Sequence, residues 1–202
     1  MKSNSTKSNH RGRRKSDPVE IENGNENALH ELFLEELADI HSAEKQLTKA
    51  LPKMAKAAES TEVTAAFKDH LEETENQISR IEKVFQSLDE PVKRKKCKGM
   101  EGLLKEGNEM AEEMGDTPAI DATLIASAQK VEHYEIATYG TLVAWAKQMG
   151  HNEAVDLLTE NLEEEKATDE RLTRLAETTA NQHAEAVAQP LTSAQHINLS
   201  SF

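Results

Sequence analysis

Glutamates interrupt apolar helical patterns at several points in this sequence, at positions where carboxylates could bind metal ions. Between residues 124 and 145, apolar side chains recur at helical spacing and leave one place on the same face, which Glu135 fills. Glu44, Glu73 and Glu165 lie at similar places in three other helical patterns. Carboxylates that face one apolar interior repel one another unless protons or cations neutralise them. A pair of divalent or trivalent metal ions would neutralise them better than protons, because such ions prefer hard oxygen ligands.

Further side chains that could bind metal lie one helical turn from these glutamates. A spacing of three or four residues puts both members of a pair on one helical face. Three pairs have this spacing: Glu132 with Glu135, His70 with Glu73, and Glu165 with Asp169. The sequence therefore predicts a metal site built from seven residues: Glu44, His70, Glu73, Glu132, Glu135, Glu165 and Asp169.

The predicted ligand set is similar to that of the carboxylate–histidine di-iron bundles but departs from it in one respect. In those bundles two helices each give a glutamate and the other two each give Glu-x-x-His. Here the order is reversed in the segment His70-Leu-Glu-Glu73, and the last helical pattern offers Thr168 and Asp169 in place of a histidine. The predicted site is thus rich in carboxylates and poor in histidine.

Structural roles are the alternative for several of these residues. A lone inward glutamate usually reaches solvent at the edge of a core, but four at one level are harder to explain in that way. His70 could be either a ligand or a hydrogen-bonded core residue. In the run 163–165, Glu165 alone has the inward phase, and the other two are expected to face solvent. Structural or packing roles are also expected for four neighbours of the site: His41, His133, Tyr134 and Tyr139. Donation of a hydrogen bond to a carboxylate is the less favoured alternative for the two tyrosines.

The elements that must position these side chains are four long helices. Apolar periodicity predicts helices over residues 28–59, 62–88, 117–150 and 152–178, the third of them starting at the pair Thr117-Pro118. The first two join by a tight turn, as do the last two. Nearly thirty residues separate the two pairs, with one short helix expected over 100–114. Two antiparallel hairpins joined by one long crossover indicate an all-α, ferritin-like four-helix bundle, whereas an up-down-up-down bundle needs only short loops.

Charge and composition suggest tails on both sides of this bundle. Residues 1–25 are polar and carry six Lys or Arg before residue 17, so we expect a disordered basic tail. The bundle is expected over 26–179 and a flexible tail over 180–202. The chain as a whole has a net charge of −13, which disfavours nucleic acid as a partner of the folded part. A solubilising role for the basic tail is favoured over contact with DNA, which stays open as the alternative.

The same composition predicts a cytoplasmic protein that does not enter membranes. No apolar run approaches the length of a membrane span, and the first residues lack the apolar stretch of a secretory signal. The single cysteine, Cys97, cannot form an internal disulfide, which agrees with a reducing compartment.

Several long segments resemble the YciF-like family of stress proteins. They are AEKQLTKAL (43–51), HLEETENQISRIEKV (70–84), KCKGMEGLLKEG (96–107), AQKVEHYEIATYGTL (128–142) and LEEEKATDERLTRLA (162–176), within a match that covers about residues 28–178. The resemblance implies a fold like that of rubrerythrins and ferritins, a candidate di-iron centre, a homodimer and a role in stress. All seven predicted ligands lie in the resembling region, and the basic tail lies outside it.

Two functions remain open from the sequence. One is an oxidoreductase of the ferroxidase or rubrerythrin kind, which binds two iron ions, with manganese as the alternative metal, and oxidises Fe(II) with O2 or peroxide. The other is a non-catalytic stress or interaction protein, whose buried acids only specify how the helices pair.

Overall fold

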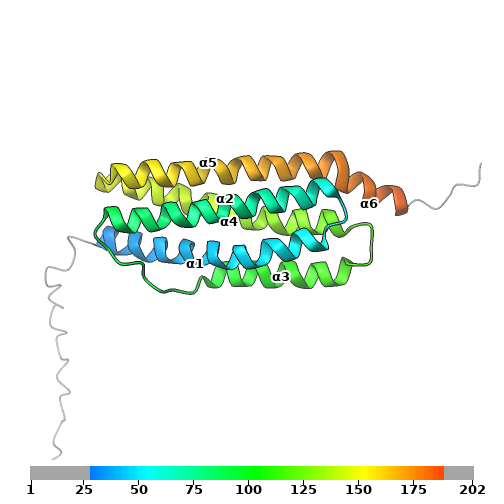
Figure 1. Cartoon of the computed structure of the whole chain (residues 1–202), viewed down its shortest axis with the longest axis horizontal. Coiled ribbons are helices and arrows are strands. Elements are labelled where there is room, and N and C mark those ends of the chain that lie inside the picture. Colours follow the sequence, from blue (N-terminus) through cyan, green and yellow to red (C-terminus); the bar gives the residue numbers. More distant parts are fainter. Residues whose placement is uncertain (1–27, 189–202) are drawn as a thin grey trace, which may run out of the picture.

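Four long helices lie side by side along one axis in the computed structural model, which describes residues 28–188 (Figure 1). They are α1 (Ala28–Ala57), α2 (Thr61–Ser87), α4 (Ile120–Met149) and α5 (Asn152–Leu175). The crossover between the two hairpins carries α3 (Lys98–Met114), which packs against the outside of α1 and α4. The predicted ferritin-like bundle, including its short crossover helix, is confirmed.

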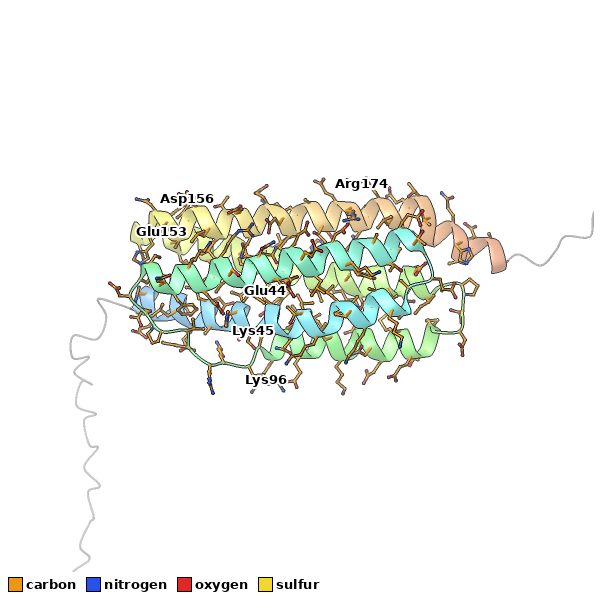
Figure 2. All side chains as sticks on the ribbon, viewed as in Figure 1. Glu44, Lys45, Lys96, Glu153, Asp156 and Arg174 are labelled. Carbon is orange, nitrogen blue, oxygen red and sulfur yellow. The ribbon has the colours of Figure 1, made fainter. Side chains whose placement is uncertain are left out.

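The bundle interior is formed by one stripe from each long helix. Helix α1 packs against α2 and α4, and α5 packs against the same two helices, so the four surround one core. The stripes predicted from the sequence are buried over most of their length, as in α1, where Leu37, Ile40, Leu47 and Leu51 are at most 2 % exposed. Glu44 belongs to this stripe and lies near the middle of α1 (Figure 2). Burial of the apolar neighbours thus forces this carboxylate into the interior.

The tight turns that pair the helices have clear local causes. Ser60 caps α2 by accepting hydrogen bonds from the backbone N–H groups of Glu62 and Val63. The Asp121 carboxylate accepts bonds from the N–H groups of Glu59 and Ser60, at 2.9 and 2.8 Å, and ties this turn to the start of α4. Gly150 ends α4 with φ 74°, a left-handed conformation that glycine adopts without strain.

Helix α4 begins later than the sequence predicted. The pair Thr117-Pro118 was expected to start it, but Ala119 is the capping residue and the helix begins at Ile120. Thr117 instead belongs to a turn after α3, in which its hydroxyl donates to the Met114 carbonyl at 2.8 Å and accepts from Ala119 N at 3.3 Å. The Thr117 hydroxyl therefore closes the turn that leads into α4 and does not cap the first residues of the helix.

The chain also stays helical beyond the predicted end of the bundle. A π-helical turn, η1 (Ala176–Ala180), follows α5 and leads into α6 (Asn181–Ala188). Residues 181–188 of the predicted C-terminal tail are therefore helical, and their alanine-rich sequence favours helix. The predicted basic tail (1–25) and the rest of the predicted C-terminal tail (189–202) lie outside the described residues. Within residues 28–188, no helix combines the length and the apolar character needed to cross a membrane.

Candidate metal centre

A cluster of buried polar side chains occupies the middle of the bundle. It draws on all four long helices and consists of Glu44 (α1), His70 (α2), Glu132 and Glu135 (α4) and Glu165 (α5), each at most 3 % exposed. One oxygen or nitrogen from each of His70, Glu132, Glu135 and Glu165 lies within 4.8 Å of the corresponding atom of the other three. Five of the seven predicted residues are thus inside the bundle, and four of them form one compact group.

His70 is positioned by a glutamate on its own helix. Its Nδ1 lies 3.4 Å from Glu73 Oε2, and its Nε2 lies 3.3 Å from Glu132 Oε1 and 3.9 Å from Glu165 Oε2. Burial lowers the pKa of His70, but the hydrogen bond with Glu73 and the charges of Glu165 and Glu44 outweigh burial, so that the pKa is raised. The ring therefore has one nitrogen held by Glu73 and the other directed into the cluster.

Most polar atoms of the cluster have no hydrogen-bond partner among the described residues. Seven buried atoms are in this position: Glu44 Oε2, His70 Nε2, Glu132 Oε2, both carboxylate oxygens of Glu135 and both of Glu165. Buried polar groups are nearly always paired, since leaving one unpaired costs about 1–3 kcal/mol. A concentration of unpaired oxygen and imidazole nitrogen atoms is the donor set that a hard metal ion accepts. The residues present therefore fit a metal ion.

Burial makes the carboxyl groups of the cluster weak acids. It raises the pKa of Glu44 to about 8, helped by the charge of Glu165, and it is also the main cause that raises the pKa of Glu132 to about 8. The pKa values of Glu135 and Glu165 are raised well above their usual range, again first by burial. With a pKa of about 8, Glu44 and Glu132 are mostly protonated at neutral pH, and a bound cation would displace these protons.

Tyr139, which the sequence places beside the site, is a direct neighbour of the cluster and donates to one of its carboxyl groups. Its hydroxyl donates a hydrogen bond to Glu44 Oε1, and both side chains are fully buried. Burial and the nearby glutamates raise the pKa of Tyr139 well above its usual range, so the phenol stays a neutral donor. The predicted role of Tyr139 was core packing. Its position one turn after Glu135 was the signal for contact with a carboxylate.

Two predicted ligands lie at the edge of the cluster. The Glu73 side chain is 41 % exposed and bonds to His70 and, at 3.3 Å, to the Thr168 hydroxyl. The Asp169 side chain is 22 % exposed, accepts a bond from Gln129 at 3.1 Å and lies 3.4 Å from His133 Nε2. The structure therefore does not bring Glu73 and Asp169 into the compact group, because their positions on the helices turn them toward the sides of α2 and α5.

An ion pair beside the cluster was also missed from the sequence. Arg80 on α2 donates two hydrogen bonds to Glu164 on α5, each 2.7 Å long, and Gln77 donates to the same carboxylate at 3.2 Å. Glu164 was expected to face solvent, but it is only partly exposed and joins α2 to α5 next to Glu165. The signal was Gln77, a polar residue in the inward stripe of α2.

The remaining neighbours hold the surrounding helices together. His41 Nε2 lies 2.9 Å from Glu82 Oε1 and joins α1 to α2. The Tyr134 hydroxyl donates to Asp39 at 2.8 Å and lies 3.0 Å from Cys97 Sγ, which joins α4 to α1 and to the start of α3. His133 is largely exposed.

Comparisons with known proteins place the chain in a family. Residues 28–185 match the family described as a domain of unknown function, DUF892. The chain is 51 % identical to the protein YciF of Escherichia coli K12 over 162 residues, which cover 80 % of this chain and 98 % of YciF. The crystal structure of the E. coli stress protein YciF superposes with a TM-score of 0.72 at 49 % identity, covering 78 % of this chain and 97 % of that one.

Two further solved structures share the fold. YcfI from Rhodopseudomonas palustris superposes with a TM-score of 0.71 at 44 % identity and covers 75 % of this chain and 96 % of its own. A protein from Xanthomonas campestris, at 22 % identity and a TM-score of 0.63, covers 80 % of this chain and 99 % of its own and shows the common fold alone. With its ferritin-like bundle and the extent of these matches, the chain belongs to the YciF-like family of DUF892 proteins.

Proposed function

We propose that the buried cluster binds two iron ions and that the protein oxidises Fe(II) with O2 or peroxide. The observation that carries this proposal is the set of seven buried oxygen and nitrogen atoms without hydrogen-bond partners in the part of the chain that the structure describes. Four of the five residues that carry these atoms each place one oxygen or nitrogen within 4.8 Å of the other three. Because the relative YciF is a stress protein, we extend the proposal to a role in the stress response.

The proposed ligands divide into an inner and an outer group. The inner group is buried and supplies the atoms without partners: Glu44, His70, Glu132, Glu135 and Glu165. Glu73 and Asp169 are partly exposed, and carboxylates that solvent reaches attract arriving cations. The ligand set is dominated by oxygen, so manganese would suit it as well as iron.

When bound, a pair of iron ions supplies the electrons that reduce O2 or peroxide, and this transfer requires no nucleophile from the chain. The chain provides orientation and a dry environment. Tyr139 fixes one oxygen of Glu44 and leaves the other free, and Glu73 fixes His70 Nδ1 and leaves Nε2 free. Such outer partners typically change metal affinity by about 10–100-fold.

Protons on the carboxyl groups are the other contribution of the chain. Since burial raises the pKa of Glu44 and of Glu132 to about 8, these two carboxyl groups are mostly protonated at neutral pH in the metal-free cluster. Each cation that binds displaces protons from these groups. The bundle can therefore fold around the cluster without metal and still offer a strongly charged site once metal enters.

The oxidation step is tested by exposing anaerobically loaded protein to O2. Fe(II) would be added to the metal-free protein, and its loss after air is admitted would be followed by an Fe(II) chelator and by the visible absorption of ferric iron. We expect faster loss with wild type and with Glu163→Ala than with Glu135→Ala. Glu163 lies two residues before Glu165, but it is exposed and its only side-chain partner among the described residues is Lys166. Equal rates for all three would contradict the proposed activity and favour a structural role for the buried acids.

A further inference from the structure

An apolar cavity outside the metal cluster lies between α1, α3 and α4. Its volume is about 220 Å³, larger than the ~150 Å³ of an engineered apolar cavity that binds benzene. Its wall is formed mainly by Met54 of α1, Leu103 and Leu104 of α3, and Leu124 and Val131 of α4. Figure 1 shows α3 running along the outside of α1, and the cavity lies under this helix.

Two glycines on α3 determine how closely this helix approaches α4 beside the cavity. A Cβ at Gly99 would lie 2.9 Å from Tyr134 Cε2, and a Cβ at Gly107 would lie 3.1 Å from Ser127 Cβ. Helix α3 therefore already touches α4 at both points, one of them near its start and the other near its middle. Gly107 and Ser127 both line the cavity, which extends from this contact to Ala50, Met54 and Ala57 of α1.

One polar group of the cavity wall has no partner. Ser127 is 7 % exposed, lines the cavity, and its Oγ forms no hydrogen bond to any described residue. Buried hydroxyls elsewhere on α4 behave differently, since Thr123 and Thr138 each donate to the carbonyl four residues earlier, both at 2.9 Å. Ser127 faces Gly107, which has no side chain to meet it. An unpaired hydroxyl in an apolar wall is suited to a ligand with one hydrogen-bonding group.

The rim of the cavity favours an uncharged ligand. Its exposed polar lining residues are Lys53, Asn108 and Glu112, one cation, one amide and one anion, so the charges of the lining sum to zero. Within residues 28–188, neither Lys53 nor Glu112 forms an ion pair. A charged ligand would meet one group of its own sign at the rim and an apolar wall beyond it.

We propose that this cavity is a binding site for a small, uncharged, mostly apolar molecule with a single hydroxyl or carbonyl group, which hydrogen-bonds to Ser127. The site is separate from the metal cluster and does not depend on metal. Its ligand packs against the leucines of α3 and joins that helix more firmly to α1.

The test uses 2-phenylethanol and its hydroxyl-free isostere propylbenzene as probes of the full-length protein. Binding would be measured by two-dimensional amide NMR on wild type, Ser127→Ala and Ala111→Leu, with the exposed Glu109→Gln on α3 as a matched control. We expect saturable shifts in the residues that line the cavity. Ser127→Ala should weaken 2-phenylethanol roughly threefold to tenfold, the value of one hydrogen bond, and leave propylbenzene unchanged.

A variant in which a larger side chain fills the cavity distinguishes binding in the cavity from weak binding to the surface. Ala111→Leu should abolish binding of both probes, whereas Glu109→Gln should bind them as wild type does. If Ala111→Leu fails to fold, Ala50→Leu fills the same space from α1. Non-saturable shifts in the wild type, or equal binding of 2-phenylethanol by wild type and Ser127→Ala, would overturn the proposal.

Discussion

The hydroxyl of Tyr139 on α4 donates a hydrogen bond to Glu44 on α1, and neither side chain is exposed to solvent. The bond joins two helices that are far apart in sequence and leaves Glu44 Oε2 as the free oxygen. It gives the buried carboxylate one fixed orientation before any cation arrives. The contact therefore links the stability of the bundle to the geometry of the proposed metal centre.

Removing the Tyr139 hydroxyl should affect both properties. In Tyr139→Phe, Glu44 Oε1 loses its donor, so we expect a loss of about 1–3 kcal/mol in the free energy of unfolding of the metal-free protein. Fe(II) affinity should fall about 10–100-fold, as for other partners of metal ligands. Denaturant unfolding and anaerobic titration measure the two effects. A variant with wild-type stability and affinity would show that the hydrogen bond has no such role.

The stability of the metal-free protein should fall as pH rises. Burial raises the pKa of Glu44 and Glu132 from 4.5 to about 8, so between these values the folded state holds protons that the unfolded chain has released. The raised pKa of His70 acts in the same direction, and the lowered pKa values of Glu73 and Glu82 matter only below 4.5. The melting temperature should therefore be lower at about pH 8.5 than at about pH 5.5. A constant or rising melting temperature would contradict this.

Neutralising one buried carboxylate should reduce this pH dependence. In Glu135→Gln, a group whose pKa is raised well above its usual range is replaced by a neutral isostere, and both of its oxygens lack partners in the described structure. We expect metal-free stability to hold or rise, with the gain largest at high pH where repulsion is strongest. Glu163→Gln is the exposed control and should leave the pH profile unchanged. A marked drop in the melting temperature of Glu135→Gln at every pH would indicate an ordinary structural role.

The fold could be predicted from sequence further than the site could. The stripes of Leu37, Ile40 and Leu47 in α1 and of their equivalents in the other helices carry the helical period, and the long crossover specifies how the hairpins are joined. The same stripes give the inward phase of Glu44, Glu135 and Glu165. Periodicity cannot tell whether a residue at the edge of a stripe points into the core or toward solvent. For this reason the sequence did not predict the partial exposure of Glu73 and Asp169.

Contacts between helices were less predictable still. The bonds of Arg80 to Glu164 and of Tyr139 to Glu44 depend on which helix faces which and at what height. Sequence spacing describes only one helix at a time. The predicted start of α4 was wrong for a local reason. Thr117 could either cap a helix or close a turn, and the sequence is compatible with both.

The assembly state is a separate prediction. The resemblance to the YciF-like family implies a homodimer, and beyond Leu175 the described chain adds only η1 and the short α6, rather than a long fifth helix of the kind that builds storage shells. Light scattering should give twice the 22.5 kDa mass of the chain. The mass of a many-subunit shell, or of a single chain, would contradict the dimer.

The central claim is that the buried carboxylates bind metal together, and the number of ions bound tests it most directly. Anaerobic calorimetric titration of metal-free protein with Fe(II) should saturate at two ions per chain for wild type and for Glu163→Ala. Glu135→Ala should bind neither ion while remaining folded by circular dichroism, because Glu135 offers an oxygen to the cluster and neither of its oxygens has a hydrogen-bond partner among the described residues. No binding by wild type at micromolar iron, or unchanged binding by Glu135→Ala, would contradict the account.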